Sequence, residues 1–124
     1  MDNVSELAEY LKSLGYTVVF CGEKSLCIPH PSLPLYLRVD LEDNFVYMSI
    51  KHGEDLRSIL EDMHDSGENV EEEVESALSY LSAASLKARM WVEERGYVPV
   101  FKLREGSLDI YEMLEEIVEE SEEE

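Results

Sequence analysis

Residues 35–50 read LYLRVDLEDNFVYMSI, and this stretch decides the fold that we expect. Apolar and polar side chains alternate over 35–41, and the alternation resumes over 45–50. A period of two residues is typical of a strand with one buried face. Residues 42–44, Glu-Asp-Asn, supply the polar turn between the two halves. The stretch therefore predicts an antiparallel β-hairpin.

Two shorter stretches before this hairpin also favour strands. Residues 16–21 are β-branched and aromatic, and an apolar run resumes at 26–28 after a turn at Gly22. The segment 29–34 contains three prolines, which a central strand could not accept. We therefore expect a first hairpin followed by a loop.

Helical spacing of apolar side chains predicts four helices. Asn69 followed by Glu72 has the pattern of a helix N-cap, and it opens the longest helix, which Gly96 ends. A strand is expected over 97–103, at a sheet edge or a bulge because of Pro99. The last helix is expected to start at Gly106-Ser107 and to turn five side chains inward: Leu108, Tyr111, Leu114, Ile117 and Val118.

The predicted element order is α-β-β-β-β-α-α-β-α, which belongs to the α+β class. We expect a single domain over residues 1–118, with a mixed or antiparallel sheet packed on the long central helix. Residues 119–124 are almost wholly acidic and are expected to form a frayed C-terminal tail.

The composition is dominated by acid: 10 basic and 29 acidic side chains in 124 residues give a formal net charge of −19. This charge makes direct nucleic-acid binding and binding to an anionic membrane unfavourable. No apolar run approaches the roughly 20 residues of a membrane span, so a cytoplasmic location is expected. The chain has no Gln and three Asn, a composition typical of thermophilic proteins.

The charge is divided unevenly along the chain. Residues 54–75 hold one basic and ten acidic side chains, and residues 105–124 hold ten acidic and no basic ones. Half of the basic residues fall in one intervening stretch: Lys87, Arg89, Arg95, Lys102 and Arg104. Two interpretations stay open: the charges complement helix dipoles, or the basic stretch forms a stripe that binds an anion or a partner.

Cys21 and Cys27 are the two cysteines of the chain. A hairpin with a three-residue loop at 23–25 would set them opposite each other, but a one-residue slip would offset them. A disulfide and buried free thiols both stay open. The C-x5-C spacing, without a second cysteine pair, does not predict a zinc site.

No motif predicts a catalytic centre, a cofactor or a metal. The three histidines, His30, His52 and His64, are scattered, and the pair Glu61 and His64 lacks the second such pair of a di-iron site. Phosphate-cradling glycine loops and a Gly-x-Ser-x-Gly elbow are missing from the sequence.

One family resemblance rests on two strand residues. Asp40 follows Leu-Arg-Val at 37–39, and Lys51 ends the next strand after Ser49-Ile50. With the predicted element order, this resembles the core of PD-(D/E)XK nucleases, in which an Asp and an acid-x-Lys bind a divalent metal. Ser49 stands where that family has its acidic residue. The resemblance therefore implies an inactive relative in which Asp40 and Lys51 are relics.

The function predicted from these features is a non-catalytic protein-interaction, adaptor or accessory module. Residues 79–88 of the long helix are rich in Ser and Ala, which would suit either a homodimer or packing on the protein's own sheet. The acidic surface suits a basic protein partner. The alternatives are a degenerate nuclease-like protein or metal-dependent hydrolase, and an acidic mimic of nucleic acid.

Overall fold

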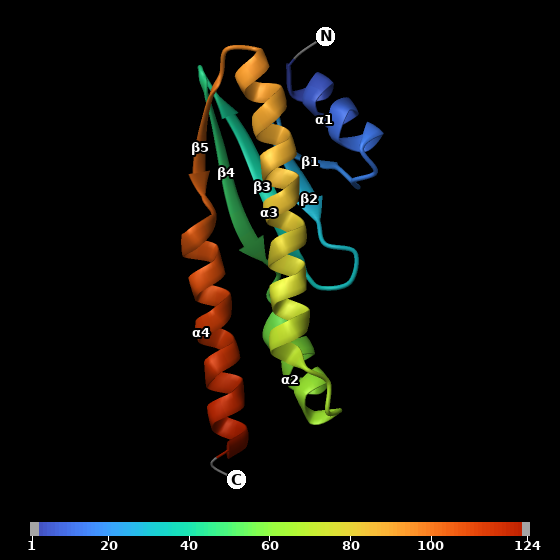
Figure 1. Cartoon of the computed structure of the whole chain (residues 1–124), viewed down its shortest axis with the longest axis vertical. Helices are drawn as coiled ribbons and strands as arrows, with labels where there is room; N and C mark the ends of the chain where they lie inside the picture. The colour runs from blue at the N-terminus through green and yellow to red at the C-terminus, as the bar shows by residue number, and fades with distance from the viewer. Residues whose placement is uncertain (1–2, 123–124) are drawn as a thin grey trace.

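A computed structural model describes residues 3–122 of the chain (Figure 1). The element order is the one expected, and the α+β class is confirmed. The elements are α1 (Asn3–Ser13), β1 (Val19–Gly22), β2 (Ser25–Pro29), β3 (Leu35–Glu42), β4 (Phe45–His52), α2 (Leu56–Asp65), α3 (Val70–Glu94), β5 (Val98–Lys102) and α4 (Leu103–Glu122).

The five strands form one mixed sheet in the order β1-β2-β3-β4-β5. The first four strands are antiparallel, whereas β5 pairs with β4 in parallel after the crossover through α2 and α3. The turn Asp43-Asn44 closes the β3–β4 hairpin, with Asp43 at a φ of 54° that Asp tolerates better than most residues. Pro99 lies on the edge strand β5, as its missing N–H predicts.

One face of the sheet carries the core. Alternate residues of β2, β3 and β4 are buried on it: Leu26, Ile28, Leu35, Leu37, Val39, Val46, Met48 and Ile50. Helix α3 runs along this face and α1 packs beside it (Figure 1). The polar members of the same alternation lie on the opposite, outer face, where Tyr36, Arg38 and Ser49 are half-buried. The strand period has therefore divided the hairpin into an apolar and a polar side.

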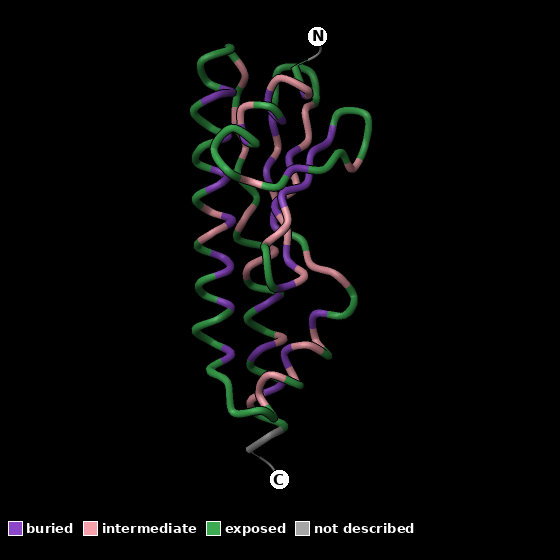
Figure 2. The backbone as a smooth tube through the Cα atoms, turned by 90° about the vertical axis from the view of Figure 1, so that its right-hand side faces the viewer, coloured by how far each residue is buried: buried purple, intermediate pink, exposed green. Residues whose placement is uncertain are grey.

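Helix α3 organises the core. Its 25 residues span about 37 Å, and its buried residues lie on the side that faces the strands (Figure 2). The Glu72 N–H donates to the Asn69 side chain at 3.1 Å, so the predicted N-cap is confirmed. The chain leaves the helix through Gly96, whose φ of 82° is left-handed.

The predicted start of the last helix was wrong. Helix α4 begins at Leu103, directly after β5, and Gly106 lies inside its first turns. A Cβ on Gly106 would lie 2.1 Å from the Ile50 carbonyl oxygen. Glycine at 106 therefore permits the close approach of α4 to β4 and does not mark a helix boundary.

The inward face of α4 also differs from the prediction. Ile110, Leu114 and Ile117 are buried, whereas the side chains of Leu108 and Tyr111 are 50% and 36% exposed. The helix is packed through the side that carries Gly106, so Leu108 points away from the core. The expected frayed tail, 119–124, is helical as far as Glu122, and residues 123–124 lie outside the described residues.

Candidate functional site

The outer face of the sheet is hollowed around Ser49 into a depression of about 910 Å³. Tyr47 and Lys51 flank Ser49 on β4, Arg38 lies opposite it on β3, and Lys102 lies beside it on β5. Residues two apart on a strand share a face, and neighbouring strands lie about 4.8 Å apart. Three long cationic side chains, which we call the cation cluster (Arg38, Lys51 and Lys102), therefore surround one small hydroxyl residue.

Arg38 is held in place by polar contacts that reach back to β2. Its Nε donates to the two carboxylate oxygens of Asp40 at 3.1 and 3.2 Å, and the buried Ser25 hydroxyl donates to Asp40 Oδ1. Within residues 3–122, its Nη1 and Nη2 groups make no hydrogen bond. The guanidinium is thus oriented through one nitrogen and keeps two donor groups for another acceptor.

The other two cations of the cluster are exposed. Lys102 Nζ lies 5.0 Å from the centroid of the Tyr47 ring, a cation–π arrangement that holds it on the outer face. Lys51 lies opposite Tyr36 and makes no hydrogen bond or ion pair with the described part of the chain.

Asp40 and Lys51, the two residues of the nuclease resemblance, lie on this same face but apart. Asp40 lies opposite Tyr47, four residues along β4 from Lys51, which is about 13 Å of strand. Asp40 is engaged by Arg38 and Ser25. Over residues 3–122, no group of three His, Cys, Asp or Glu side chains is placed to hold a metal ion. Asp40 therefore acts as the support of Arg38 alone.

The five basic residues proposed as one stripe are divided among four places. Arg95 Cζ lies 4.1 Å from the centroid of the Trp91 ring, and Arg95 Nε lies 3.9 Å from Glu6 Oε2. Lys102 lies on the outer face of the sheet, whereas Arg89 and Arg104 line a hollow between α3 and α4. Lys87 is exposed on α3. Strand and helix periodicity separates residues that the sequence shows as one run.

A second surface is the groove between α3 and α4. Three adjoining hollows of about 400, 520 and 420 Å³ follow one another along the two helices. Ser82 and Leu86 line the first two, and Tyr111 lines the second and third. We call this surface the α3–α4 groove, and its principal lining residues are Ser79, Ser82, Ala83, Leu86, Arg89, Phe101, Arg104, Ser107, Tyr111 and Val118.

The small residues of 79–88 serve two faces of α3. Ala84 and Ala88 are buried against the protein's own core, whereas Ser82 and Ala83 line the groove. Ser85 is buried and also lines the first hollow of the groove. The small-residue stretch was thus a mixture of two signals, one for internal packing and one for an open surface. Leu86, 53% exposed among these small residues, is the side chain that distinguishes the open side.

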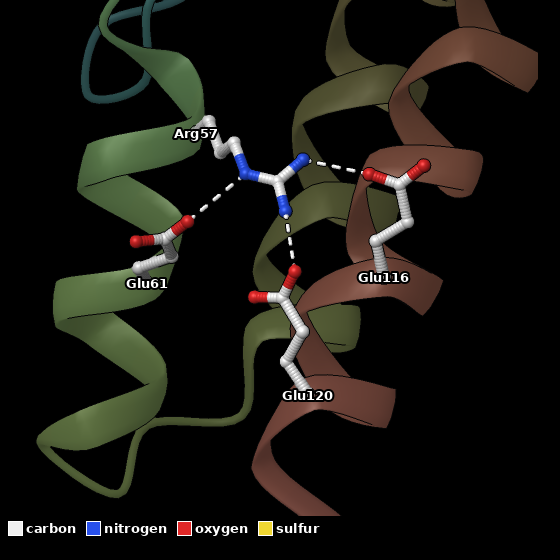
Figure 3. A network of polar contacts seen from close by, with 4 residues as sticks. All are labelled: Arg57, Glu61, Glu116 and Glu120. Atoms are coloured by element: carbon white, nitrogen blue, oxygen red, sulfur yellow. Dashed lines mark hydrogen bonds and ion pairs between the residues drawn. The ribbon is translucent and has the colours of Figure 1, made fainter.

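The two acidic blocks of the sequence meet at one end of the molecule, where α2, the start of α3 and the end of α4 lie together (Figure 1). Arg57 on α2 binds the carboxylates of Glu61 at 3.0 Å, Glu116 at 2.7 Å and Glu120 at 3.2 Å (Figure 3). Its hydrogen bonds to Glu116, and then to Glu61, raise the pKa of Arg57 above its ordinary value. One guanidinium thus links two helices within an end that we call the acidic pole (residues 54–75 and 112–122).

Cys21 and Cys27 are joined by a disulfide with a Cα–Cα distance of 5.9 Å. They are not directly opposite each other. Cys27 pairs with Val19, and Cys21 lies in an irregularity of β1 between Phe20 and Gly22. The hairpin loop has two residues, so the expected three-residue loop was wrong, and the irregularity supplies the offset that lets the sulfur atoms meet.

His30 and His52 both contact the backbone of neighbouring residues. His30 Nδ1 accepts the backbone N–H groups of Ser32 at 3.1 Å and Leu33 at 3.0 Å, and its ring packs edge-on against Tyr80. Burial lowers the pKa of His30 below its ordinary value, although Glu73 acts in the opposite direction. His52 lies beside the carbonyl of Gly53 at 2.9 Å.

Within residues 3–122, every helix is too short or too polar to cross a membrane. No known protein family, curated protein or solved structure matches the chain.

The sequence did not predict that Arg38, Tyr47 and Ser49 are neighbours on one surface. The signal was the phase of the strand alternation, which puts Arg38, Asp40, Ser49 and Lys51 together on the polar side of the hairpin.

Proposed function

We propose that the protein is a non-catalytic interaction module that binds an amphipathic helix of a basic partner protein in the α3–α4 groove. The observation that carries this proposal is the run of exposed apolar side chains along the groove. Leu86 is 53% exposed, Phe101 is 40% exposed and Tyr111 is 36% exposed. Exposed apolar patches of this kind, with polar rims, are typical of protein-binding surfaces.

The shape of the groove suits a helix. Ser82, Leu86 and Arg89 follow one another at helical spacing on α3, and Ser107 and Tyr111 do so on α4. The antiparallel helices therefore present two facing stripes with small residues at the centre. A helix lies in such a groove with its apolar residues at spacings of three and four.

Charge favours a basic partner. The groove is lined by Arg89 and Arg104 at one end and by Glu71, Glu115 and Glu119 at the other. The acidic pole and the net charge of −19 would attract a cationic protein and oppose a second copy of the chain. We therefore favour a partner helix with its basic end on the glutamates over a homodimer.

The test compares two substitutions at similarly exposed leucines. Leu86→Asp places a charge in the groove, and Leu14→Asp places the same charge on a leucine that is 45% exposed after α1. Proteins captured from native lysate by the wild type are identified, and their helical segments are titrated as labelled peptides by fluorescence anisotropy.

We expect Leu86→Asp to weaken peptide binding about tenfold or more, because a charge would be buried at the centre of the contact. Leu14→Asp should leave binding unchanged, and added salt should weaken it. Equal binding by both variants, or binding that is insensitive to salt, contradicts the proposal. A stable dimer of the wild type that Leu86→Asp dissociates would favour self-association.

The acidic mimic of nucleic acid is the second candidate, because α2, the start of α3 and the end of α4, which carry the two acidic blocks of the sequence, lie together at the acidic pole. A mimic displaces DNA or RNA from its partner. A partner that binds the protein and nucleic acid at the same time removes this candidate.

A further inference from the structure

We propose that the outer face of the sheet binds a small phosphate-bearing molecule at Ser49, between the side chains of the cation cluster. This site is separate from the α3–α4 groove. Three of the ten basic side chains of a strongly acidic chain surround a single small residue here. The depression of about 910 Å³ lies within the usual size of ligand sites.

The fixed guanidinium of Arg38 distinguishes this cluster from scattered surface lysines. Asp40 takes only the Nε of Arg38, and Ser25 holds Asp40 from a buried position on β2. Arg38 is therefore oriented before a ligand arrives, and its two Nη groups can donate side by side to two phosphate oxygens. The energetic cost of ordering this side chain on binding is correspondingly small.

The surrounding residues complete a phosphate site. The Ser49 hydroxyl can donate from the floor, and the ammonium groups of Lys51 and Lys102 flank it from β4 and β5. Tyr36 and Tyr47 line the same depression and offer aromatic surface to the rest of the ligand.

The carboxylates of the depression favour a small ligand. Glu42, Glu105 and Asp109 also line the depression. These carboxylates would repel an acidic peptide or a nucleic-acid strand that extended beyond the cluster. A compact anion can instead lie among the three cations, with the Asp40 carboxylate, which Arg38 Nε already binds, as the nearest negative charge. The three carboxylates can also accept hydrogen bonds from hydroxyl or amino groups of the ligand.

The acidic pole does not prevent such binding. Glu116 lies about 20 Å along α4 from the start of the helix beside the cluster. At about 0.15 M salt the Debye length is about 8 Å, so the field of the pole is largely screened at Ser49.

The experiment is calorimetric titration of the full chain with inorganic phosphate and pyrophosphate at that salt concentration, with amide chemical shifts as a second readout. We expect pyrophosphate to bind and to shift the resonances of β4 around Ser49. Arg38→Gln should weaken binding about tenfold or more, the loss typical of a hydrogen bond to a charged group. Lys87→Gln, the same charge change on α3, should weaken it less than about twofold.

The variant Asp40→Asn distinguishes two explanations of pyrophosphate binding, an oriented site and a diffuse positive field. The substitution removes one negative charge, so a diffuse field would bind pyrophosphate more tightly. The oriented site predicts weaker binding, because a neutral amide holds the Arg38 Nε less firmly. Ser25→Ala should weaken binding in the same direction without any change of charge.

Several outcomes would overturn the proposal. These are no binding of either anion, equal losses in Arg38→Gln and Lys87→Gln, and tighter binding by Asp40→Asn. A short polyglutamate peptide or an oligonucleotide that binds Ser49 more tightly than pyrophosphate would also overturn it, since the ligand would then be a macromolecule.

Discussion

Lys102 and Arg104 are separated by one residue, yet they belong to different surfaces. Lys102 ends β5 and lies over Tyr47 on the outer face of the sheet, whereas Arg104 lines the α3–α4 groove. The first surface is polar and is organised by fixed side-chain contacts, and the second is largely apolar. The phase of a strand or helix, and not distance along the chain, decides which surface a charge serves.

The largest effect on both surfaces is expected from a substitution of Gly106, because this residue lies where α4 borders both of them. Gly106→Ala puts a Cβ 2.1 Å from the Ile50 carbonyl oxygen, so α4 or β4 must move. We expect a loss of about 3 kcal/mol in the free energy of unfolding, measured in urea.

The matched control is Gly96→Ala, at a glycine with a φ of 82° and no atom within 4 Å of its Cβ position. The strain of a left-handed alanine should cost about 1 kcal/mol. A Gly106→Ala loss no larger than this control would contradict the close packing of α4 on β4.

Loss of the disulfide should affect the sheet, on whose outer face the cation cluster lies, and spare the α3–α4 groove. The bond closes a short loop, with a sequence separation of 6, at the β1–β2 edge of the sheet. The double variant Cys21→Ser/Cys27→Ser should lose about 2 kcal/mol in urea unfolding. Amide exchange should rise in β1 and β2 and stay unchanged in α3 and α4. Equal exchange changes in all four elements would argue against a local role.

The smallest effect is expected at His30, which belongs to neither surface. Its folded-state pKa is lowered, mainly by burial, so the unfolded chain takes up a proton first as pH falls. The free energy of unfolding should therefore decrease as pH falls from 7.5 through the ordinary value of 6.5.

His30→Asn is the control for this pH effect, because its side-chain carbonyl can accept the same N–H groups without titrating in this range. The difference between wild type and variant isolates the histidine from the many carboxylates. A variant that loses stability as steeply as the wild type over this pH range would show that His30 has no part in it.

The parts of the fold that local chemistry decides were predictable from the sequence. The alternation over 35–50 gave the central hairpin, and Asn69 gave the start of α3. The start of α4 was missed because a glycine in the sequence is typical of a turn or a helix boundary. Gly106 is instead required by the close contact of α4 with Ile50, which only the tertiary structure shows. The same limit applies to Cys21, whose place in a strand irregularity depends on pairing with β2.

The candidate site was predictable only as separate residues. Asp40, Lys51 and Lys102 were each singled out, but for different reasons and different sites. Their common surface depends on the register of β3 with β4 and on the parallel pairing of β5, which joins residues about 50 positions apart. Arg38 was overlooked because its significance comes from its partner Asp40.

The direct passage from β5 into α4 has a consequence for the evolution of this protein. No linker residue separates Lys102 from Leu103, so an insertion there has no loop to absorb it. One added residue would turn α4 by about 100° and carry Ile110 and Leu114 away from the core. Length variation among natural variants should therefore spare this junction and collect in the 30–34 and 66–69 connections.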